Sequence, residues 1–310
     1  MKRLLLPLLA IAAATPLMAQ NERAPFVIEE TGRTFWRLDD AVKSIGEGQG
    51  TIVIGPGQFK ECAVQAAGSI TYRAAQPGSV IFDGVACDGK AALVFRGIFA
   101  RVEGIIFQNI RVPDRNGSGI RLEKGDLEVD NSIFRNSEQG ILTNEGPTMN
   151  VKVDRSTFSG LGGCPDGMCS HSLYIGNNAS LSVTNSRFEK GTGGHYLKSR
   201  AAMTQISGNS FDDTRGRTTN YHIDLPAGSG GSITKNVFVQ GRDKENYSAI
   251  IALGAEERIH RSVGLVIAGN DVSIAPGIDR ETTFIGDWTH EPLRIGQNKI
   301  GPGVKLSDQR

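Results

Sequence analysis

VDNSIFRNS, residues 129–137, is one copy of a pattern that recurs along this chain. Each copy begins with a β-branched residue and places a phenylalanine or an aliphatic residue five positions later, usually with an asparagine or serine shortly before it. The other copies are VEGIIFQNI (102–110), VDRSTFSGL (153–161), VTNSRFEKG (183–191), ISGNSFDDT (206–214), ITKNVFVQG (233–241), IAGNDVSIA (267–275) and IGQNKI (295–300).

The spacing of these copies indicates a solenoid. Their phenylalanines lie 23 to 30 residues apart, and repeats of that length bury their apolar faces only by stacking on one another. Short alternating runs, such as GIRLE from Gly119 and SLYIG from Ser172, fit strands, and no helical run separates them. This excludes repeated strand–helix–strand units and leucine-rich repeats. The sequence therefore predicts an all-β protein, a single parallel coil of roughly nine or ten turns.

Stacked coils place equivalent side chains above one another. We expect strands about 4.8 Å apart, a column of phenylalanines, and a ladder of asparagine amides at the turns. The asparagines are Asn131, Asn185, Asn209, Asn236, Asn270 and Asn298. From about residue 50 to residue 300 the pattern resembles the right-handed parallel β-helix proteins of the pectate-lyase-like superfamily. That superfamily includes lyases, hydrolases, esterases and non-catalytic spike proteins, so the resemblance implies a fold without naming a reaction.

The first 19 residues have the layout of a secretory signal peptide. Lys2 and Arg3 precede an apolar run over residues 4–14, and small residues lead to a predicted cleavage after Ala19. Eleven apolar residues are too few to cross a bilayer, which needs about 20. We therefore expect an exported protein, periplasmic or extracellular, with no membrane insertion after the signal is cleaved.

The remaining chain divides by pattern into a lead-in with a capping helix (residues 20–50), the parallel β-helix (51–300) and a C-terminal tail (301–310). Leu38, Ala41, Val42 and Ile45 follow the spacing of an amphipathic helix that ends near Gly46. A helix at this place would cover the open end of the solenoid and prevent pairing at its edge.

Charge and cysteine content indicate which partners are disfavoured and whether disulfides are expected. The 34 lysines and arginines balance 33 acidic residues, which gives no overall bias towards nucleic acid or acidic membranes. Four cysteines in an exported chain indicate two disulfides, and proximity favours Cys62–Cys87 and Cys164–Cys169. A zinc site using Cys164, Cys169 and His171 is the alternative, but it lacks a second ligand pair at a recognised spacing.

Function must come from side chains that point outward from the strands. The segment GGHYLKSRA, from Gly193, is unusually polar for a strand. If Leu197 points inward, strict alternation divides its neighbours between the two sides of the strand. The predicted outward set is Tyr196, Lys198 and Arg200, and the predicted inward set is His195, Leu197 and Ser199.

Neighbouring coils add further outward groups. These are Tyr174 in the coil before, His222 and Asp224 in the coil after, and Arg121 with Glu123 in the coil that precedes Tyr174. Aligning the strands by their distance to the next phenylalanine places Tyr174, Lys198 and Asp224 in one row, with Tyr196 and His222 in the neighbouring row. The sequence therefore predicts a solvent-facing patch in a shallow groove, although Lys198 and Asp224 could also form a plain ion pair between coils.

The segments GHYLKSRA and HIDLP also resemble those of a widespread group of exported bacterial β-helix repeat proteins, over approximately Cys164 to Glu256. This second resemblance supports the patch and names no reaction.

The side chains of the patch match the needs of polyuronate β-elimination, which requires a cation for the sugar carboxylate, a base and an acid. Arg200 would clamp the carboxylate, Lys198 or His222 would be the base, and Tyr174 or Tyr196 the acid. The substrate-binding set is completed by Arg121, Glu123, His171, His195 and Asp224. A glycoside hydrolase needs two carboxylates about 5 to 9.5 Å apart, and Asp224 and Glu123 are too far separated to fit.

The sequence thus predicts an exported carbohydrate-active protein, a polysaccharide lyase acting on a polyuronate. The alternative is a non-catalytic polysaccharide-binding or surface protein. The expected partner is an acidic or neutral extracellular polysaccharide, and a monomer is expected. No cofactor is predicted; Ca²⁺ could replace arginine as the neutralising cation, but the sequence offers no clear cluster of carboxylates to hold it. If Lys198 is solvent-facing and catalytic, Lys198→Ala should abolish turnover and leave the thermal midpoint nearly unchanged.

Overall fold

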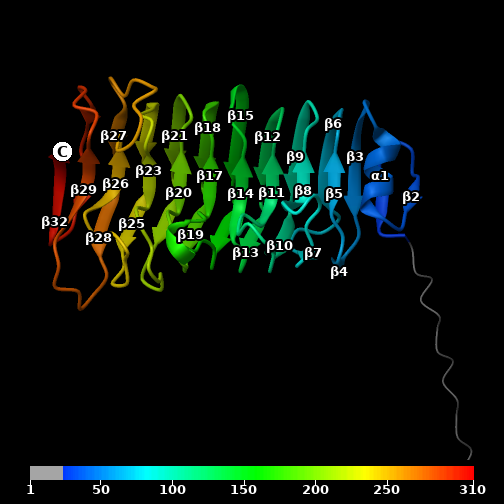
Figure 1. The fold of residues 1–310 in the computed structure, drawn as a ribbon, viewed down its shortest axis with the longest axis horizontal. Helices are drawn as coiled ribbons and strands as arrows, with labels where there is room; N and C mark the ends of the chain where they lie inside the picture. The colour runs from blue at the N-terminus through cyan, green and yellow to red at the C-terminus, as the bar shows by residue number, and fades with distance from the viewer. Residues whose placement is uncertain (1–23) are drawn as a thin grey trace, which may run out of the picture.

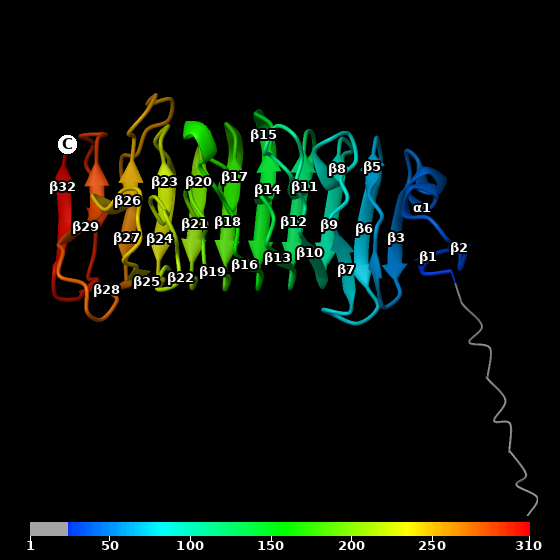
Figure 2. The same cartoon turned by 60° about the horizontal axis from the view of Figure 1, so that its bottom comes forward.

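Residues 24–310, the part of the chain that this computed structural model describes, wind into one right-handed coil of parallel strands about 9 turns long (Figure 1). The predicted fold class is confirmed, and the coil number agrees with the repeat count. The predicted signal peptide lies outside the described residues. Each full turn contributes one strand to each of three sheets, which run along the solenoid axis as its three faces (Figures 1 and 2).

Sheet A has twelve strands, nearly all of them parallel. In spatial order they are β2 (Thr34–Phe35), β1 (Phe26–Ile28), β3 (Gln49–Ile54), β6 (Ser69–Ala74), β9 (Phe99–Glu103), β12 (Asp126–Asp130), β15 (Gly146–Asp154), β18 (Asn178–Thr184), β21 (Met203–Ser207), β24 (Gly230–Thr234), β27 (Val266–Ala268) and β30 (Arg294–Ile295).

Sheets B and C have ten strands each. Sheet B is β4 (Gly57–Phe59), β7 (Val80–Asp83), β10 (Ile105–Gln108), β13 (Ile133–Arg135), β16 (Thr157–Ser159), β19 (Arg187–Glu189), β22 (Ser210–Asp212), β25 (Val237–Gln240), β28 (Asp271–Ile274) and β31 (Lys299–Ile300). Sheet C is β5 (Ala63–Gln65), β8 (Ala91–Phe95), β11 (Ser118–Leu122), β14 (Gln139–Thr143), β17 (Leu173–Ile175), β20 (Leu197–Ser199), β23 (Ile223–Leu225), β26 (Ala249–Leu253), β29 (Thr282–Asp287) and β32 (Val304–Gln309).

The N-terminal end is covered as expected. Helix α1 (Leu38–Ile45) buries Leu38, Ala41 and Val42 and ends at Gly46, whose positive φ of 61° suits glycine. On the N-terminal side of β3, the first strand of the parallel coil, β1 pairs with β3 in the antiparallel sense. This pairing was not predicted. Within residues 24–310, no helix is long and apolar enough to span a membrane.

The other end of the solenoid extends further than predicted. Residues 301–310, expected to form a tail, contain β32, which pairs with β29 and completes sheet C.

The phenylalanine column forms the centre of the core. From Phe82 to Phe238 seven rings stack in successive coils, with centroid separations of 4.7 to 5.7 Å. Offset stacking at this distance adds about 0.5 to 1.5 kcal/mol per pair beyond the area that each ring buries. The predicted column is therefore confirmed, and it fixes the register of the coils.

The asparagine ladder is confirmed in the C-terminal half only. Asn209, Asn236, Asn270 and Asn298 form a chain in which each side-chain amide donates to the next side-chain oxygen, at 2.8 to 3.1 Å. Towards the N-terminus the chain continues through Ser186, Ser156 and Ser132, whose hydroxyls accept backbone N–H groups. Asn131 and Asn185 lie one residue earlier and take up left-handed turn conformations, with φ of 46° and 49°. Their inclusion in the ladder was wrong.

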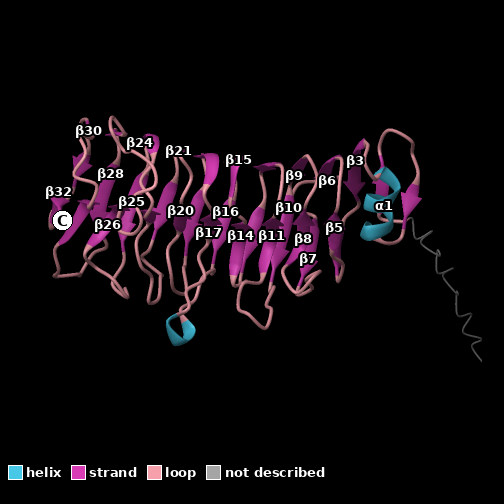
Figure 3. Ribbon diagram, turned by 45° about the horizontal axis from the view of Figure 1, so that its top comes forward, coloured by secondary structure: helices cyan, strands magenta, loops and turns pink. Residues whose placement is uncertain are grey.

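Both predicted disulfides are present, Cys62–Cys87 and Cys164–Cys169. The second closes a loop that carries the short 3₁₀ helix η1 (Pro165–Gly167), which projects from the body of the solenoid (Figure 3). Among the described residues, one group of side chains has metal-ligand spacing: Cys164, Cys169 and Glu245. Because its two sulfurs are joined to each other, they are not available as thiolate ligands.

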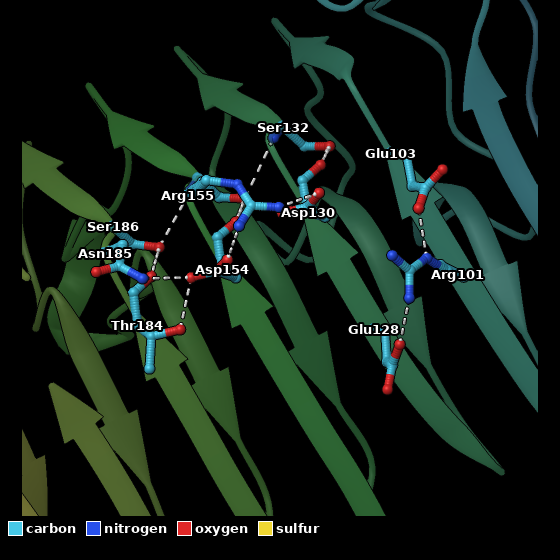
Figure 4. Close-up of polar contacts among 11 residues, drawn as sticks. Arg101, Glu103, Glu128, Asp130, Ser132, Asp154, Arg155, Thr184, Asn185 and Ser186 are labelled. Carbon is cyan, nitrogen blue, oxygen red and sulfur yellow. Dashed lines mark hydrogen bonds and ion pairs between the residues drawn. The ribbon is translucent and has the colours of Figure 1, made fainter. Parts of the chain in front are cut away.

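The outer face of sheet A carries ion pairs between neighbouring coils (Figure 4). Arg101 bridges Glu103 and Glu128, and Arg155 bridges Asp130 and Asp154. Exposed pairs of this kind contribute little to stability.

Candidate functional site

The predicted row of outward side chains exists on sheet C. Tyr174 in β17, Lys198 in β20 and Asp224 in β23 are directly paired positions of neighbouring parallel strands. The same row continues in one direction through Leu142 to Arg121 and in the other to Ala252. The coil that contains Leu142 separates Arg121 from Tyr174, so Arg121 lies one coil further away than expected, about 10 Å along the axis.

The neighbouring row was predicted incorrectly. Strand β20 begins only at Leu197, and the segment before it contains Gly193 and Gly194 with φ of 136° and 63°. This irregular backbone breaks the strict alternation that the prediction assumed. As a result, Tyr196 turns into the core, where its side chain is 1% exposed, and His195 turns outward to lie beside Asp224.

Tyr196 belongs to a buried polar cluster away from sheet C's outer face. Its hydroxyl donates to Asp213 Oδ1 at 2.6 Å and accepts from the Gly191 N–H at 3.1 Å. Burial, followed by the negative charge of Asp213, raises the pKa of Tyr196 well above its usual value. Lys244 and Thr219 also contact Asp213. The closed set of contacts makes Tyr196 a structural residue.

His222 is likewise buried in the core. It is 0% exposed and lies edge-on to the rings of Phe211 and Phe238, at centroid distances of 6.4 and 6.0 Å. Its Nε2 faces the Val239 carbonyl at 3.3 Å, which assigns the proton to that nitrogen. Burial holds the pKa of His222 well below its usual value. Because no solvent reaches it, His222 cannot serve as the expected base.

Lys198 points out from the strand but is covered. Only 8% of its surface is exposed, because its ammonium lies between Glu256 Oε1 at 2.6 Å and Asp224 Oδ2 at 3.3 Å. The premise that Lys198 is solvent-facing was therefore wrong. Its ion pairs lead us to expect a loss of stability when Lys198 is removed. A lysine held by two carboxylates is an ion-pair partner with little freedom to reach a substrate as a base.

Asp224 is more deeply buried than Lys198, at 3% exposed. Burial raises its pKa to about 6, and the Lys198 ammonium opposes that rise. Its second neighbour is His195, whose Nε2 lies 3.3 Å from Asp224 Oδ2. His195 Nδ1 accepts the Tyr221 N–H at 3.2 Å, so Nε2 carries the proton and donates to the carboxylate.

His171 joins the site from the previous coil. Its ring stacks on His195 at 4.8 Å and meets the Tyr174 ring edge-on at 5.0 Å. Its Nδ1 accepts the His195 N–H at 3.0 Å. Burial, with Lys198 and Arg200 nearby, lowers the pKa of His171 to about 3. Both histidines are therefore neutral N–H donors at ordinary pH.

Tyr174 and Arg200 form a hydrogen-bonded pair that remains open to a groove. The Arg200 guanidinium donates from Nη1 to the Tyr174 hydroxyl at 2.5 Å and lies 5.5 Å from the Tyr174 ring centre. Through Nη2, Arg200 also pairs with Glu256. Both side chains are only half-buried, and both line a groove of about 870 Å³ on sheet C.

The groove extends from Tyr174 towards Arg121. Its lining residues are Asn116, Arg121, Leu142, Thr143, Asn144, Glu145, Tyr174, Gly176, Arg200, Glu256 and Glu257. Arg121 donates from Nη2 to Asn144 Oδ1 at 2.6 Å, and its Nε has no hydrogen-bond partner in the described chain. Burial lowers the pKa of Arg121. Arg121 is thus a half-buried guanidinium that forms no ion pair within residues 24–310.

Glu123 lies outside this groove. It forms ion pairs with Lys90 and Arg96, at 2.5 and 2.6 Å. Its predicted contribution to substrate binding has no geometric support, because its carboxylate is fully engaged by these two cations.

Glu256 is the functional candidate that the sequence analysis missed. It lies on the loop between β26 and β27, 58 residues after Lys198, and no strand pattern points to it. One signal was present: the coil from Phe238 to Val272 takes 34 residues, more than any earlier gap, and the extra length is rich in charge (GAEERIHR). A long charged insertion in one coil is the type of loop that forms the wall of a site.

Comparisons with known proteins support the fold. The structure is similar to ORF18 of Geobacillus virus E2, with a TM-score of 0.53, 13% identity, and 87% of this chain and 57% of that chain covered. It is also similar to an alginate lyase from Paenibacillus sp. str. FPU-7, with a TM-score of 0.53, 15% identity, and 87% and 94% covered. No protein-family model matches the chain, and no curated protein sequence is significantly similar to it. At these identities the likeness establishes one conclusion: the chain has the fold of the parallel β-helix proteins.

Proposed function

We propose that this protein is a carbohydrate-active enzyme that cleaves an acidic polysaccharide by β-elimination in the groove of sheet C. The observation that carries the proposal is the pairing of the Tyr174 hydroxyl with the Arg200 guanidinium in the lining of the groove. The likeness of the fold to that of an alginate lyase is consistent with it.

The chemistry follows from what each group can do. Arg200 donates to the phenol oxygen and so stabilises the negative charge that develops there when the hydroxyl proton leaves. The Tyr174 phenolate would take the proton from the sugar carbon next to the carboxylate. A carbon–carbon double bond forms, the bond to the glycosidic oxygen breaks, and the proton on Tyr174 passes to that leaving oxygen. The phenolate is thereby restored.

The substrate carboxylate must be neutralised for this proton to become acidic. Arg200 Nη2 and Lys198 Nζ face the same point, which Glu256 now occupies. Arg121, which lines the groove and forms no ion pair within residues 24–310, would hold a second carboxylate of the polymer further along the groove. A polymer with one carboxylate per sugar can meet both positions at once, which is the reason that a polyuronate is the proposed substrate class.

The test uses a panel of polyuronates and follows ultraviolet absorbance for the new unsaturated bond. We expect absorbance to rise with the wild-type protein. Tyr174→Phe should reduce the rate of this rise at least 100-fold, since general acid–base groups contribute about 10²–10⁴-fold to the rate. Tyr221→Phe, which removes a hydroxyl outside the lining of the groove, is the matched control and should keep the rate.

Binding of the polymer without any rise in absorbance would refute the lyase proposal and select the non-catalytic binding protein. A rise that is unchanged in Tyr174→Phe would refute the role of Tyr174.

A further inference from the structure

Glu256 holds the two cations of the site with both of its carboxylate oxygens. Oε1 accepts from Lys198 Nζ at 2.6 Å, and Oε2 pairs with Arg200 Nη2. The other terminal nitrogen of Arg200 donates to Tyr174. Although burial opposes it, the hydrogen bond from Lys198 and the two positive charges lower the pKa of Glu256. Glu256 is therefore ionised, and the Arg200 guanidinium lies between its carboxylate and the Tyr174 hydroxyl.

The loop that carries Glu256 anchors it to the neighbouring coil by its backbone. The Gly254 N–H donates to the Leu225 carbonyl at 2.9 Å, and the Glu256 N–H donates to the Pro226 carbonyl at 3.1 Å. The side chain itself remains 46% exposed, in contrast to the 10% of Lys198. A fixed backbone with an exposed side chain allows the carboxylate to leave the cations by rotation about its own bonds, without unfolding the loop.

We infer that Lys198 and Arg200 form a carboxylate-binding subsite, and that Glu256 fills this subsite until the carboxylate of an acidic sugar replaces it. The identification of the ligand as an acidic sugar rests on the proposed function. The subsite itself rests only on the contacts of Glu256.

This arrangement selects for charge. A neutral sugar that displaced Glu256 would leave Arg200 without an anion and would leave Lys198, which is almost completely buried, with Asp224 as its one remaining carboxylate. Removing a carboxylate partner from half-buried and buried cations is unfavourable. A sugar carboxylate restores both ion pairs, so the exchange loses little. Glu256 thus acts as a specificity-determining residue, because it must be outcompeted by a group of the same charge and shape.

The experiment removes the internal carboxylate and supplies one from solution. We compare thermal midpoints of the wild type, Glu256→Ala and Glu256→Gln in sodium acetate, sodium galacturonate, sodium chloride of equal ionic strength, and galactose. Glu257→Ala is the matched control, since Glu257 is the next residue of the loop, also lines the groove, and forms no ion pair within the described chain.

We expect Glu256→Ala to have a lower midpoint than the wild type, and acetate or galacturonate to raise it by about 2 to 4 °C. Chloride and galactose should not do so, and the wild type and Glu257→Ala should show no carboxylate-specific rise. Glu256→Gln keeps the size of the side chain and should show the same dependence, which provides a second test if the alanine variant folds poorly.

The inference would be overturned if carboxylates raised the thermal midpoint of neither Glu256 variant. It would also be overturned if they raised the midpoints of all four proteins equally. Because the midpoint requires no turnover, a carboxylate-specific rise would stand even if no polyuronate is cleaved, and the two proposals can therefore fail separately.

Discussion

Acidification from pH 7 to pH 5 should destabilise this protein strongly, because three buried histidines must accept protons on unfolding. His171, His195 and His222 all have pKa values held below 6.5 in the folded state, first by burial. Below pH 6.5 the unfolded chain binds protons at these positions and the folded chain does not. The free energy of unfolding therefore falls as pH decreases through this range.

The magnitude follows from the linkage of protons to folding. Each histidine that stays neutral in the folded state contributes a loss of about 1.4 kcal/mol per pH unit below its unfolded pKa. Asp224 acts in the opposite direction, because its folded pKa of about 6 lies above its ordinary 3.8, so the folded state gains a proton first. Between pH 6 and pH 5 the net uptake on unfolding is about two protons, which corresponds to about 2.7 kcal/mol per pH unit.

The assay is equilibrium urea unfolding at closely spaced pH values, followed by circular dichroism and checked by refolding. Over pH 5 to 6.5 we expect a loss of about 4 kcal/mol. The variant His222→Phe should reduce the slope of the free energy of unfolding against pH by the equivalent of about one proton, whatever its absolute stability. His290→Gln, which replaces an exposed histidine, should leave this slope unchanged. A flat or rising stability over this range would refute the burial of these histidines as neutral groups.

Three further predictions concern individual contacts. Lys198→Met should cost about 3 kcal/mol at pH 8, where Asp224 is left as a buried unpaired carboxylate, and less at pH 5, where Asp224 is protonated; an equal loss at both pH values would contradict the pairing. Tyr196→Phe should lower the free energy of unfolding by about 1–3 kcal/mol, measured in urea, while polymer binding is retained; a loss of binding would return Tyr196 to the site. Replacing Cys62 and Cys87 by serine should cost about 3.5 kcal/mol, against about 2 kcal/mol for Cys164 and Cys169, because the first disulfide closes the longer loop; the thermal midpoints should follow this order.

The parts of the fold that repeat could be predicted from the sequence. The phenylalanine column from Phe82 to Phe238 is visible as a period because stacking requires the same side chain at the same place in each coil. Helix α1 could be predicted from its own spacing. Asn131 and Asn185 show the limit of the method, because a shift of one residue exchanges an inward ladder position for a left-handed turn.

The candidate site was predictable only within regular strands. Tyr174, Lys198 and Asp224 align because each lies inside a strand that alternates. Tyr196 and His222 were misplaced because each precedes the first residue of a three-residue strand, where loop backbone and not alternation sets the direction. Glu256 comes from a loop, and its proximity to Lys198 depends on the path of the chain between coils, which no local pattern encodes.

The single row that joins Arg121 to Tyr174 has a consequence for how such a site can diversify. Each coil between them contributes one position to the row, as Leu142 does here. Insertion or loss of one whole repeat would therefore change the separation of the two groups by one strand spacing, about 4.8 Å. Duplication of a repeat thus offers a stepwise route to new spacings between the two groups.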